Sequence, residues 1–341
     1  MRQVVIDGPH SAKVIDAPDP APPGPGDAVV KVELAGICGS DLHFYDGDIP
    51  VGGPLSVGHE FVGTVTAVGR DVTRFRPGDR VLTSSVAGCG HCDGCATGDP
   101  VTCVEGPKVF GSGALAGGQA ESVGVPAADF QMIRIPDGVD DRSALLLTDN
   151  LNTGWIAARR ADFAPGATVA VLGLGAVGQC AVRSALLLGA GRVLAVDPVA
   201  GRRQLAADFG AEPLEGPTVE SILEMTSGRG ADAVIDAVAL DATLDAALSA
   251  VRPGGTVSVV GVHHPGPYPL PILMGLFRSV TLRLTTAPVH QTWKELLPLV
   301  TSGRLRTDGI FTHTFELEDA PDGYRLAAAR NGDSIKVALE P

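Results

Sequence analysis

Four cysteines lie within fifteen residues of one another, in the segment 89–103. Their spacing is C-x2-C-x2-C-x7-C, with glycines between them that let the backbone bend. Four thiolates at this spacing can close a tetrahedron around Zn²⁺ and leave no place for a substrate, which predicts a structural site. A chance group of free thiols and a four-cysteine iron–sulfur cluster are the alternatives. The predicted ligands are Cys89, Cys92, Cys95 and Cys103, and His91 inside the loop is interpreted as a bystander.

A second set of metal-binding side chains is scattered along the chain. Cys38 lies in G-I-C-G-S-D-L-H, His59 in G-H-E, and Asp149 follows Thr148. One sulfur, one nitrogen and one oxygen ligand with a fourth position open is the pattern of a catalytic zinc site. Each of these residues alone is weak evidence, because a lone buried cysteine or a hydrogen-bonded histidine is the commoner case. The prediction therefore depends on their combination.

A glycine-rich turn follows an apolar run at 168–172 and precedes an apolar helix-like segment. It reads G-L-G-A-V-G, and Asp197 ends the next strand-like run. Such glycines allow a tight turn and the approach of a pyrophosphate, while an acid at that distance accepts hydrogen bonds from ribose hydroxyls. The carboxylate favours NAD over NADP, although Arg202 and Arg203 could accommodate a 2′-phosphate, and a turn without any ligand is the alternative. The predicted cofactor-binding residues here are Gly173, Gly175, Ala176, Val177, Gly178, Asp197 and Arg202.

The sequence around these residues shows two patterns of predicted secondary structure. Short β-like runs broken by Gly and Pro fill the first ~150 residues, at 28–34, 61–68, 80–83 and 120–125. From about Gly154 strands and helices alternate: strands at 169–172, 193–196, 233–236 and 256–261, and helices from 176, 202 and 244. This alternation predicts a parallel sheet covered by helices. After Pro288 the pattern loosens, and the tail predicts a strand at 312–315, a helix near 324–329 and a strand at 335–339.

Length and charge exclude several classes of protein. The 341 residues are enough for two domains, and the net charge of −13 without a basic run argues against nucleic-acid and membrane-surface binding. No signal-like apolar stretch opens the chain, and no uncharged run is long enough to span a bilayer. Six cysteines in a chain of this size do not make a disulfide scaffold. We therefore expect a cytoplasmic protein whose clustered cysteines bind metal.

These motifs together resemble the zinc-containing medium-chain dehydrogenases, over essentially the whole chain. The signature G-H-E-x-x-G begins at Gly58, and F-R-P-G-D-R-V follows at 75–81. The resemblance implies an α/β fold in which a doubly wound Rossmann sheet is inserted in a GroES-like, β-rich catalytic domain, with the active site in the cleft between them. It also implies the boundaries 1–152 for the catalytic domain with its structural-zinc lobe at about 86–105, 153–287 for the NAD-binding domain, and 288–341 for the return.

The resemblance also assigns roles to residues. Cys38 and His59 match the first two catalytic zinc ligands, Glu60 matches an acidic neighbour that approaches the metal in some members, and Asp149 stands at the third, variable ligand position. The proton-relay positions are matched by Ser40 and His43. Thr153 matches a residue beside the nicotinamide, and the segment from Val260 to Val262 resembles the one whose backbone meets its carboxamide.

The expected protein is thus a zinc-dependent, NAD-linked alcohol dehydrogenase with two Zn²⁺ per chain, acting on a secondary alcohol or polyol. A zinc-free quinone or enoyl reductase, and an inactive nucleotide-binding protein on the same fold, are the alternatives. The resemblance implies a homo-oligomer, with a tetramer favoured over a dimer. The apolar stretch 269–277 could form part of that interface or be a helix buried in the monomer. Four apolar side chains could line a substrate pocket or pack in the core: Phe44, Leu55, Phe110 and Trp293.

Overall fold

The chain forms two compact units. The computed structural model describes residues 1–216, 218–329, 332 and 334–341. The first unit comprises 1–152, 288–330 and 336–341, and the second comprises 153–287 and 331–335. The predicted return segment 288–341 includes residues 330, 331 and 333, which lie outside the described residues.

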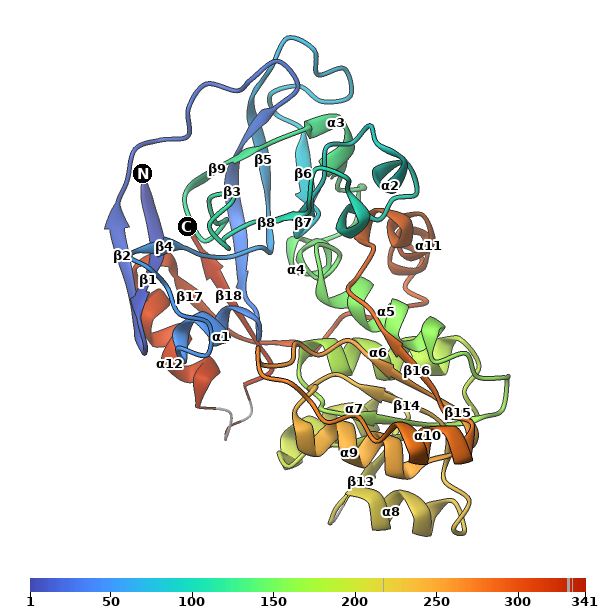
Figure 1. Cartoon of the computed structure of the whole chain (residues 1–341). Coiled ribbons are helices and arrows are strands. Elements are labelled where there is room, and N and C mark those ends of the chain that lie inside the picture. The colour runs from blue at the N-terminus through green and yellow to red at the C-terminus, as the bar shows by residue number, and fades with distance from the viewer. Residues whose placement is uncertain (217, 330–331, 333) are drawn as a thin grey trace. The chain divides into compact units, whose positions relative to one another are not determined.

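A seven-stranded sheet forms the centre of the first unit. Its strands follow the order β10, β6, β5, β3, β18 and β17, and β9 also pairs with β3. The bounds are β3 (Ala28–Ile37), β5 (Phe61–Val68), β6 (Arg80–Thr83), β9 (Ser122–Val125), β10 (Met132–Arg134), β17 (Phe311–Glu316) and β18 (Lys336–Glu340) (Figure 1). Smaller sheets are made by β1 (Arg2–Gly8), β2 (Ser11–Asp16) and β4 (Leu55–Ser56), and by β7 (Val86–Ala87) and β8 (Lys108–Val109).

Strand β3 brings distant segments of the chain together. Its first half alternates buried and solvent-facing residues, as expected for a strand with one face on the core. Antiparallel pairing sets Ala35 opposite Phe61 of β5 and Leu339 of β18. The three strands are neighbours in the sheet, in the order β5, β3, β18. Residues just before β5 and at the start of β18 therefore lie on either side of the end of β3.

The helices of the first unit are mostly short. They are α1 (Asp41–Tyr45), α2 (Asp93–Ala96), α3 (Ala128–Gln131), α4 (Asp141–Leu146), α11 (Val289–Thr301) and α12 (Ala320–Ala328), and α5 (Asn150–Arg160) continues into the second unit. The Asp140 side chain accepts the N–H of Ser143 and so caps α4. Tyr324 of α12 is fully buried in the core formed with β3 and β5.

The second unit is a doubly wound α/β fold. Its six strands are all parallel, in the order β13, β12, β11, β14, β15, β16. They are β11 (Thr168–Leu172), β12 (Arg192–Val196), β13 (Glu212–Leu214), β14 (Ala231–Asp236), β15 (Val251–Val259) and β16 (Thr281–Leu284). The helices are α6 (Ala176–Leu187), α7 (Ala200–Asp208), α8 (Thr218–Met225), α9 (Asp241–Ala250) and α10 (Ile272–Arg278) (Figure 1). Every residue of β11 is buried, as expected for a central strand covered on both faces. The predicted fold class is confirmed.

Several predicted element bounds were wrong by a few residues. β9 begins at Ser122, α9 begins at Asp241, and β15 spans Val251–Val259 instead of 256–261. The larger error concerns α11, a helix of 13 residues where the sequence pattern loosens. It contains Pro298, a residue that usually ends a helix. None of the helices in the described part of the chain is both long and apolar enough to cross a membrane.

Candidate active site and metal centres

The four cysteines of the segment 89–103 converge on one point. Their sulfur atoms all lie within 4.8 Å of one another. Cys89 Sγ is 3.9 Å from Cys95 Sγ, and Cys92 Sγ is 4.0 Å from Cys103 Sγ. Four thiolates on one Zn²⁺ would be separated by about 3.8 Å, because each Zn–S bond is about 2.3 Å long. The donor set and its spacing are consistent with a structural zinc site.

Local backbone geometry forms this lobe. Cys92 is the N-cap of α2, and its sulfur accepts the N–H of Cys95 at 3.4 Å. Backbone N–H groups, first that of Cys95, lower the pKa of Cys92 to about 6, while burial raises the pKa of Cys95 to about 12. His91 is largely exposed, and its Nδ1 lies 2.9 Å from the carbonyl oxygen of Cys89. The four sulfurs are thus the convergent donors, and His91 lies outside them.

The second predicted ligand set also comes together. The ligand atoms of Cys38, His59, Glu60 and Asp149 all lie within 4.8 Å of one another. His59 Nε2 is 3.1 Å from Asp149 Oδ2 and 3.9 Å from Glu60 Oε1. Three separated segments contribute: the turn after β3, the residues before β5, and the turn before α5. A sulfur, a nitrogen and two carboxylates within this distance fit a Zn²⁺ ion. Without a cation between them, donors this close would repel one another or share protons.

His59 is held by a buried carboxylate that the sequence analysis did not select. Asp41 Oδ1 is 3.3 Å from His59 Nδ1, and Asp41 Oδ2 accepts the N–H of Cys38 at 2.9 Å. Burial lowers the pKa of His59, but Asp41 and Cys38 oppose it, so that the pKa lies well above its usual value. A carboxylate on Nδ1 leaves Nε2 directed at the other ligands, as in many metal-binding histidines. The signal was present in the sequence, since Asp41 lies three residues after Cys38.

Two further polar side chains complete the centre and were also missed. Asn150 Nδ2 donates to Glu60 Oε1 at 2.9 Å and lies 4.0 Å from Cys38 Sγ. Lys336 Nζ lies 2.7 Å from Glu60 Oε1 and 2.6 Å from Oε2. Burial lowers the pKa of Lys336, but Glu60 and the other acidic groups raise it above its ordinary value. A Lys–Glu ion pair, with both side chains almost fully buried, therefore adjoins the ligand cluster.

The predicted relay residues lie on α1. Ser40 is the N-cap of this helix, and its Oγ lies 3.4 Å from His59 Nε2. His43 is one turn further on, and its Nδ1 lies 3.0 Å from Asp48 Oδ2. The structure thus brings Ser40 to the ligand cluster, while His43 pairs with a carboxylate of the following loop.

The glycine-rich turn of the second unit joins β11 to α6 as predicted. Gly173 has a φ of +83°, and a Cβ on Gly178 would lie 1.8 Å from the carbonyl oxygen of Gly173, so neither position accepts a side chain. A Cβ on Gly175 would meet no atom within 4 Å, and α6 has no side-chain cap. Ala176 and Val177, which open α6, are half-buried. An uncapped helix start beside open space fits a dinucleotide pyrophosphate.

Asp197 lies at the end of β12 and is held in place by the backbone. Its Oδ2 accepts the N–H of Leu174 at 2.8 Å, and its Oδ1 accepts that of Val199 at 2.8 Å. Arg202 Nη1 lies 3.7 Å from Asp197 Oδ2, and Arg202 Nη2 donates to the carbonyl of Ser334 at 2.7 Å. Arg202 is therefore engaged by groups of the second unit itself, and Arg203 Nη1 donates to the backbone carbonyl of Asp197 at 2.7 Å.

The other predicted residues of the second unit differ in exposure. Thr153 is buried in α5, and Val260 is half-buried, with its N–H donating to the carbonyl of Asp236 at 3.0 Å. Val262 is 50% exposed. Sequence reasoning missed Asp236, whose carboxylate accepts the N–H groups of Val238 and Ala239 and so fixes the loop after β14.

The proposed pocket-lining side chains are mainly core residues. Phe110 is 1% exposed and stacks edge-on against Phe61. Trp293 is buried and donates its indole N–H to the carbonyl of Leu147 at 2.8 Å. Phe44 and Leu55 are half-buried and pack against the same core as Phe61. Core packing explains all four.

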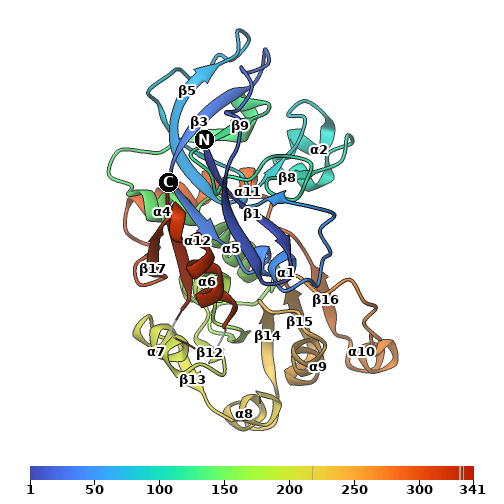
Figure 2. The ribbon, with the colours of Figure 1, turned by 90° about the vertical axis from the view of Figure 1, so that its left-hand side faces the viewer.

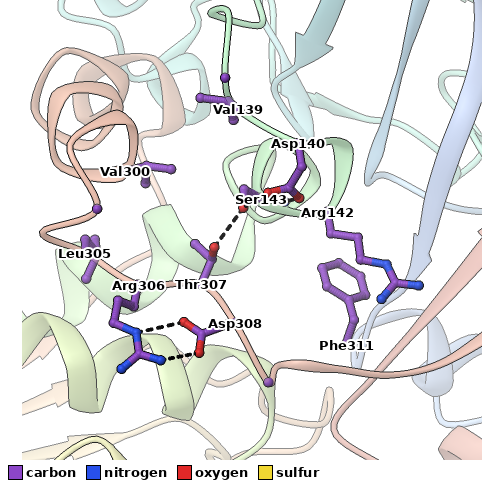
Figure 3. A pocket seen from close by; sticks show the side chains of 13 residues that line it. Val139, Asp140, Arg142, Ser143, Val300, Leu305, Arg306, Thr307, Asp308 and Phe311 are labelled. Atoms are coloured by element: carbon purple, nitrogen blue, oxygen red, sulfur yellow. Dashed lines mark hydrogen bonds and ion pairs between the residues drawn. The ribbon is translucent and has the colours of Figure 1, made fainter.

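A cavity of about 470 Å³ lies elsewhere in the first unit, between α4, the end of α11 and the loop before β17 (Figure 3). Its polar side chains bind one another: Ser143 Oγ lies 2.8 Å from Thr307 Oγ1, and Arg306 pairs with Asp308. None of the predicted site residues lines it. We therefore assign the cavity no part in the chemistry.

A further group of potential metal ligands lies in the second unit. Asp241 Oδ1 is 2.8 Å from His263 Nε2 and 3.4 Å from His264 Nε2. His264 Nδ1 accepts the N–H of Gly266 at 3.0 Å, so its Nε2 carries the ring proton. That nitrogen cannot bind a metal in this arrangement, and we interpret the group as a surface hydrogen-bonded cluster.

Comparison with known proteins identifies the family. The family model for the alcohol dehydrogenase GroES-like domain matches residues 24–137, and that for zinc-binding dehydrogenase matches residues 176–302. A Mycobacterium tuberculosis protein named "Probable zinc-binding alcohol dehydrogenase" is 58% identical over 341 residues, which is 100% of this chain and 89% of that protein. The chain therefore belongs to the zinc-binding alcohol dehydrogenase family and is an oxidoreductase of that family.

Solved structures agree with this assignment. The alcohol dehydrogenase TADH of Thermus sp. ATN1 superimposes with a TM-score of 0.91 at 39% identity, covering 100% of this chain and 99% of the other. An alcohol dehydrogenase of Escherichia coli CFT073, in complex with NADH, gives 0.89 at 27% identity, with coverage of 100% and 99%. A zinc-binding dehydrogenase candidate of Sinorhizobium meliloti 1021, bound to NADP, gives 0.85 at 29% identity, also with 100% and 99%.

Proposed function

We propose that the protein oxidises a secondary alcohol or polyol to a carbonyl compound with NAD, and catalyses the reverse reduction, using one catalytic and one structural zinc ion per chain. The observation that supports this best is the convergence of Cys38, His59 and Asp149 from three separated segments. When bound, zinc would lower the pKa of an alcohol, and NAD would accept the hydride. The residues of this chain would bind both groups and remove the proton.

Ser40 is the side chain placed to take the alcohol proton. Its Oγ lies beside His59 Nε2, and it has no cap hydrogen bond within α1. His43, one turn along the same helix, would pass the proton to solvent, since imidazole exchanges protons near neutral pH. Asp48 would orient the His43 ring through Nδ1.

Asp197 supports the choice of NAD over NADP. Its carboxylate is fixed by two backbone N–H groups, and it would repel a 2′-phosphate while accepting hydrogen bonds from ribose hydroxyls. Arg202, which could attract that phosphate, is near Asp197 and bonded to Ser334. Relatives of this fold are known with NADH and with NADP, so the affinity for each must be measured.

Two rival functions remain to be tested against this proposal. A zinc-free reductase would have no use for either ligand cluster, and an inactive nucleotide-binding protein would not need Ser40 beside His59. The decisive experiment is a screen of alcohols and polyols by NADH absorbance, with zinc and iron quantified on the same sample. NADH formation by a protein with two zinc ions is expected. Absence of zinc, or of any turnover with zinc bound, would refute the proposal.

We further propose that the protein forms a homo-oligomer through α10 and β16, with a tetramer favoured over a dimer. No residue of α10 is buried, which argues against a helix within the core of the monomer. Its exposed apolar side chains are Ile272, Leu273, Leu276 and Phe277, and Leu284 of β16 is 69% exposed. Figure 2 shows α10 beside β16, the last strand of the sheet. An apolar patch on an unpaired sheet edge favours association. Light scattering tests this proposal: the molar mass of the Phe277→Lys variant should be smaller than that of the wild-type assembly.

The cysteines support a cytoplasmic location as part of this proposal. None of the six, all of which are described residues, forms a disulfide, and five of them belong to the two candidate metal sites. Thiolate ligands persist best in a reducing compartment.

A further inference from the structure

The Glu60 carboxylate is close enough to join the catalytic ligand set, but it is already bound by other groups. It is fully buried, and both of its oxygens lie within 2.7 Å of Lys336 Nζ. Asn150 Nδ2 donates a further hydrogen bond to Oε1. The same Oε1 is 3.9 Å from His59 Nε2, whereas Asp149 Oδ2 is 3.1 Å from it. Of the two carboxylates, Asp149 therefore lies nearer to His59 Nε2.

The β-sheet creates the space in which this ion pair forms. Gly36 of β3 pairs with Ala338 of β18, and its N–H donates to the carbonyl of Glu60. A Cβ on Gly36 would lie 3.0 Å from Glu60 Oε2 and 3.0 Å from Lys336 Cε. The glycine thus leaves a gap in which the side chain of Glu60, the residue before β5, meets that of Lys336, the first residue of β18.

Stability alone gives little reason for such a pair. Removing two charges from water costs about as much as their attraction returns, and an apolar pair of similar size would pack as well. The pair adjoins the ligand cluster, however, and Asn150, the second donor, follows the ligand Asp149 in the sequence. This placement indicates a role at the metal centre.

We infer that Lys336 and Asn150 hold the Glu60 carboxylate away from the catalytic metal, so that the chain supplies three ligands and not four. The inference rests on the zinc site proposed above. Lys336 and Asn150 are positioning residues, because they act through Glu60. Without Lys336, Glu60 would be an uncompensated buried carboxylate next to a divalent cation and would turn toward it.

The test measures how the catalytic metal is bound in the Lys336→Met variant of the full chain. Release of the catalytic zinc to a chelator should slow severalfold, because a fourth protein ligand must also dissociate before the ion leaves. With Co²⁺ substituted at this site, the visible absorption spectrum should change, because one more oxygen ligand is present. Release and spectrum equal to wild type would overturn the inference.

Two matched variants separate the cause from general damage. Lys336→Arg keeps a cation and should behave as wild type. Lys336→Met with Glu60→Gln removes both charges and should restore rapid release; if release stays slow, Glu60 is not responsible and the inference is wrong.

A variant that keeps the ion pair covers the case in which Lys336→Met fails to fold. Asn150→Ala removes one donor to Glu60 and should slow zinc release by less than Lys336→Met does. Combining Asn150→Ala with Glu60→Gln must abolish that slowing. No Glu60-dependent change in either pair of variants would overturn the inference. Failure of the proposed function would instead appear in the wild type, as fewer than two zinc ions or no hydride transfer.

Discussion

Asp41 and His59 form a buried pair in which the carboxylate Oδ1 lies 3.3 Å from imidazole Nδ1. Asp41 is also tied to Gln119 Nε2 at 3.2 Å, and Gln119 Oε1 accepts the hydroxyl of Tyr324 at 2.8 Å. A buried hydrogen-bonded chain therefore runs from α12 to the imidazole. It fixes the ring so that Nε2, and not Nδ1, meets the other ligands.

Asp41→Asn should weaken the catalytic zinc site. The amide cannot support the imidazole as a carboxylate does, and loss of such a partner typically costs ten- to a hundredfold in metal affinity. Zinc content after dialysis against a chelator should fall from two ions toward one, with activity falling in parallel. Asp71→Asn, an exposed carboxylate, is the control and should keep both ions. Retention of both ions by Asp41→Asn would contradict the role given to this pair.

Cys103→Ser should remove the structural zinc and destabilise the first unit. Three thiolates hold zinc less tightly than four, and the free energy of metal binding contributes to folding. We expect a Tm lower by more than about 5 °C, since each kcal/mol shifts Tm by roughly 2–4 °C in a unit of this size. Cys180→Ala, a buried cysteine outside both clusters, should keep two zinc ions. Iron in the purified wild type would favour the iron–sulfur alternative.

Local spacing made much of the site predictable. The cysteine lobe and the turn at Gly173 are set within about fifteen residues, so the sequence displays them directly. Lys336 is 276 residues from Glu60, and only the pairing of β18 with β3 brings them together. Helix α11 was missed because Pro298 gives a signal for a helix end, which packing of Trp293 and Leu296 in the core overrides. Contacts made by sheet register and tertiary packing leave no local pattern to read.

Asp197→Asn should shift the cofactor preference toward NADP. The amide keeps one oxygen for the backbone but loses the charge that repels a 2′-phosphate, and it frees Arg202 from its ion pair. Hydrogen bonds to a charged acceptor contribute about 1.5–3 kcal/mol, so NADH affinity should fall by roughly ten- to a hundredfold. Fluorescence titration with NADH and NADPH measures both constants. An unchanged ratio would mean that Asp197 does not contact the ribose.

His43→Ala should slow alcohol oxidation chiefly at low pH. Hydroxide can remove the proton at high pH without help, but at pH 6 a relay group is needed, and we expect a loss of about tenfold or more there. The pH–rate profile with a saturating alcohol measures this, with Asp48→Asn as the partner variant that should give a smaller loss. If the rate of alcohol oxidation falls by the same factor at every pH, the substitution has damaged the fold, and the relay role proposed for His43 is wrong.

His290 should make the protein sensitive to acid. Burial lowers the pKa of this imidazole to about 3, because it stacks on Phe130 with ring centroids 4.2 Å apart and has no hydrogen-bond partner in the described part of the chain. In the unfolded chain its pKa is about 6.5. The folded state therefore favours the neutral ring, so this contribution to stability is complete above pH 6.5 and is lost as the pH falls toward 3. The loss approaches about 1.4 kcal/mol per pH unit. Urea unfolding at pH 7 and pH 5 should show His290→Phe losing less stability than wild type, whereas His10→Gln, an exposed histidine, should follow wild type. Equal losses in all three proteins would mean that water reaches the His290 ring.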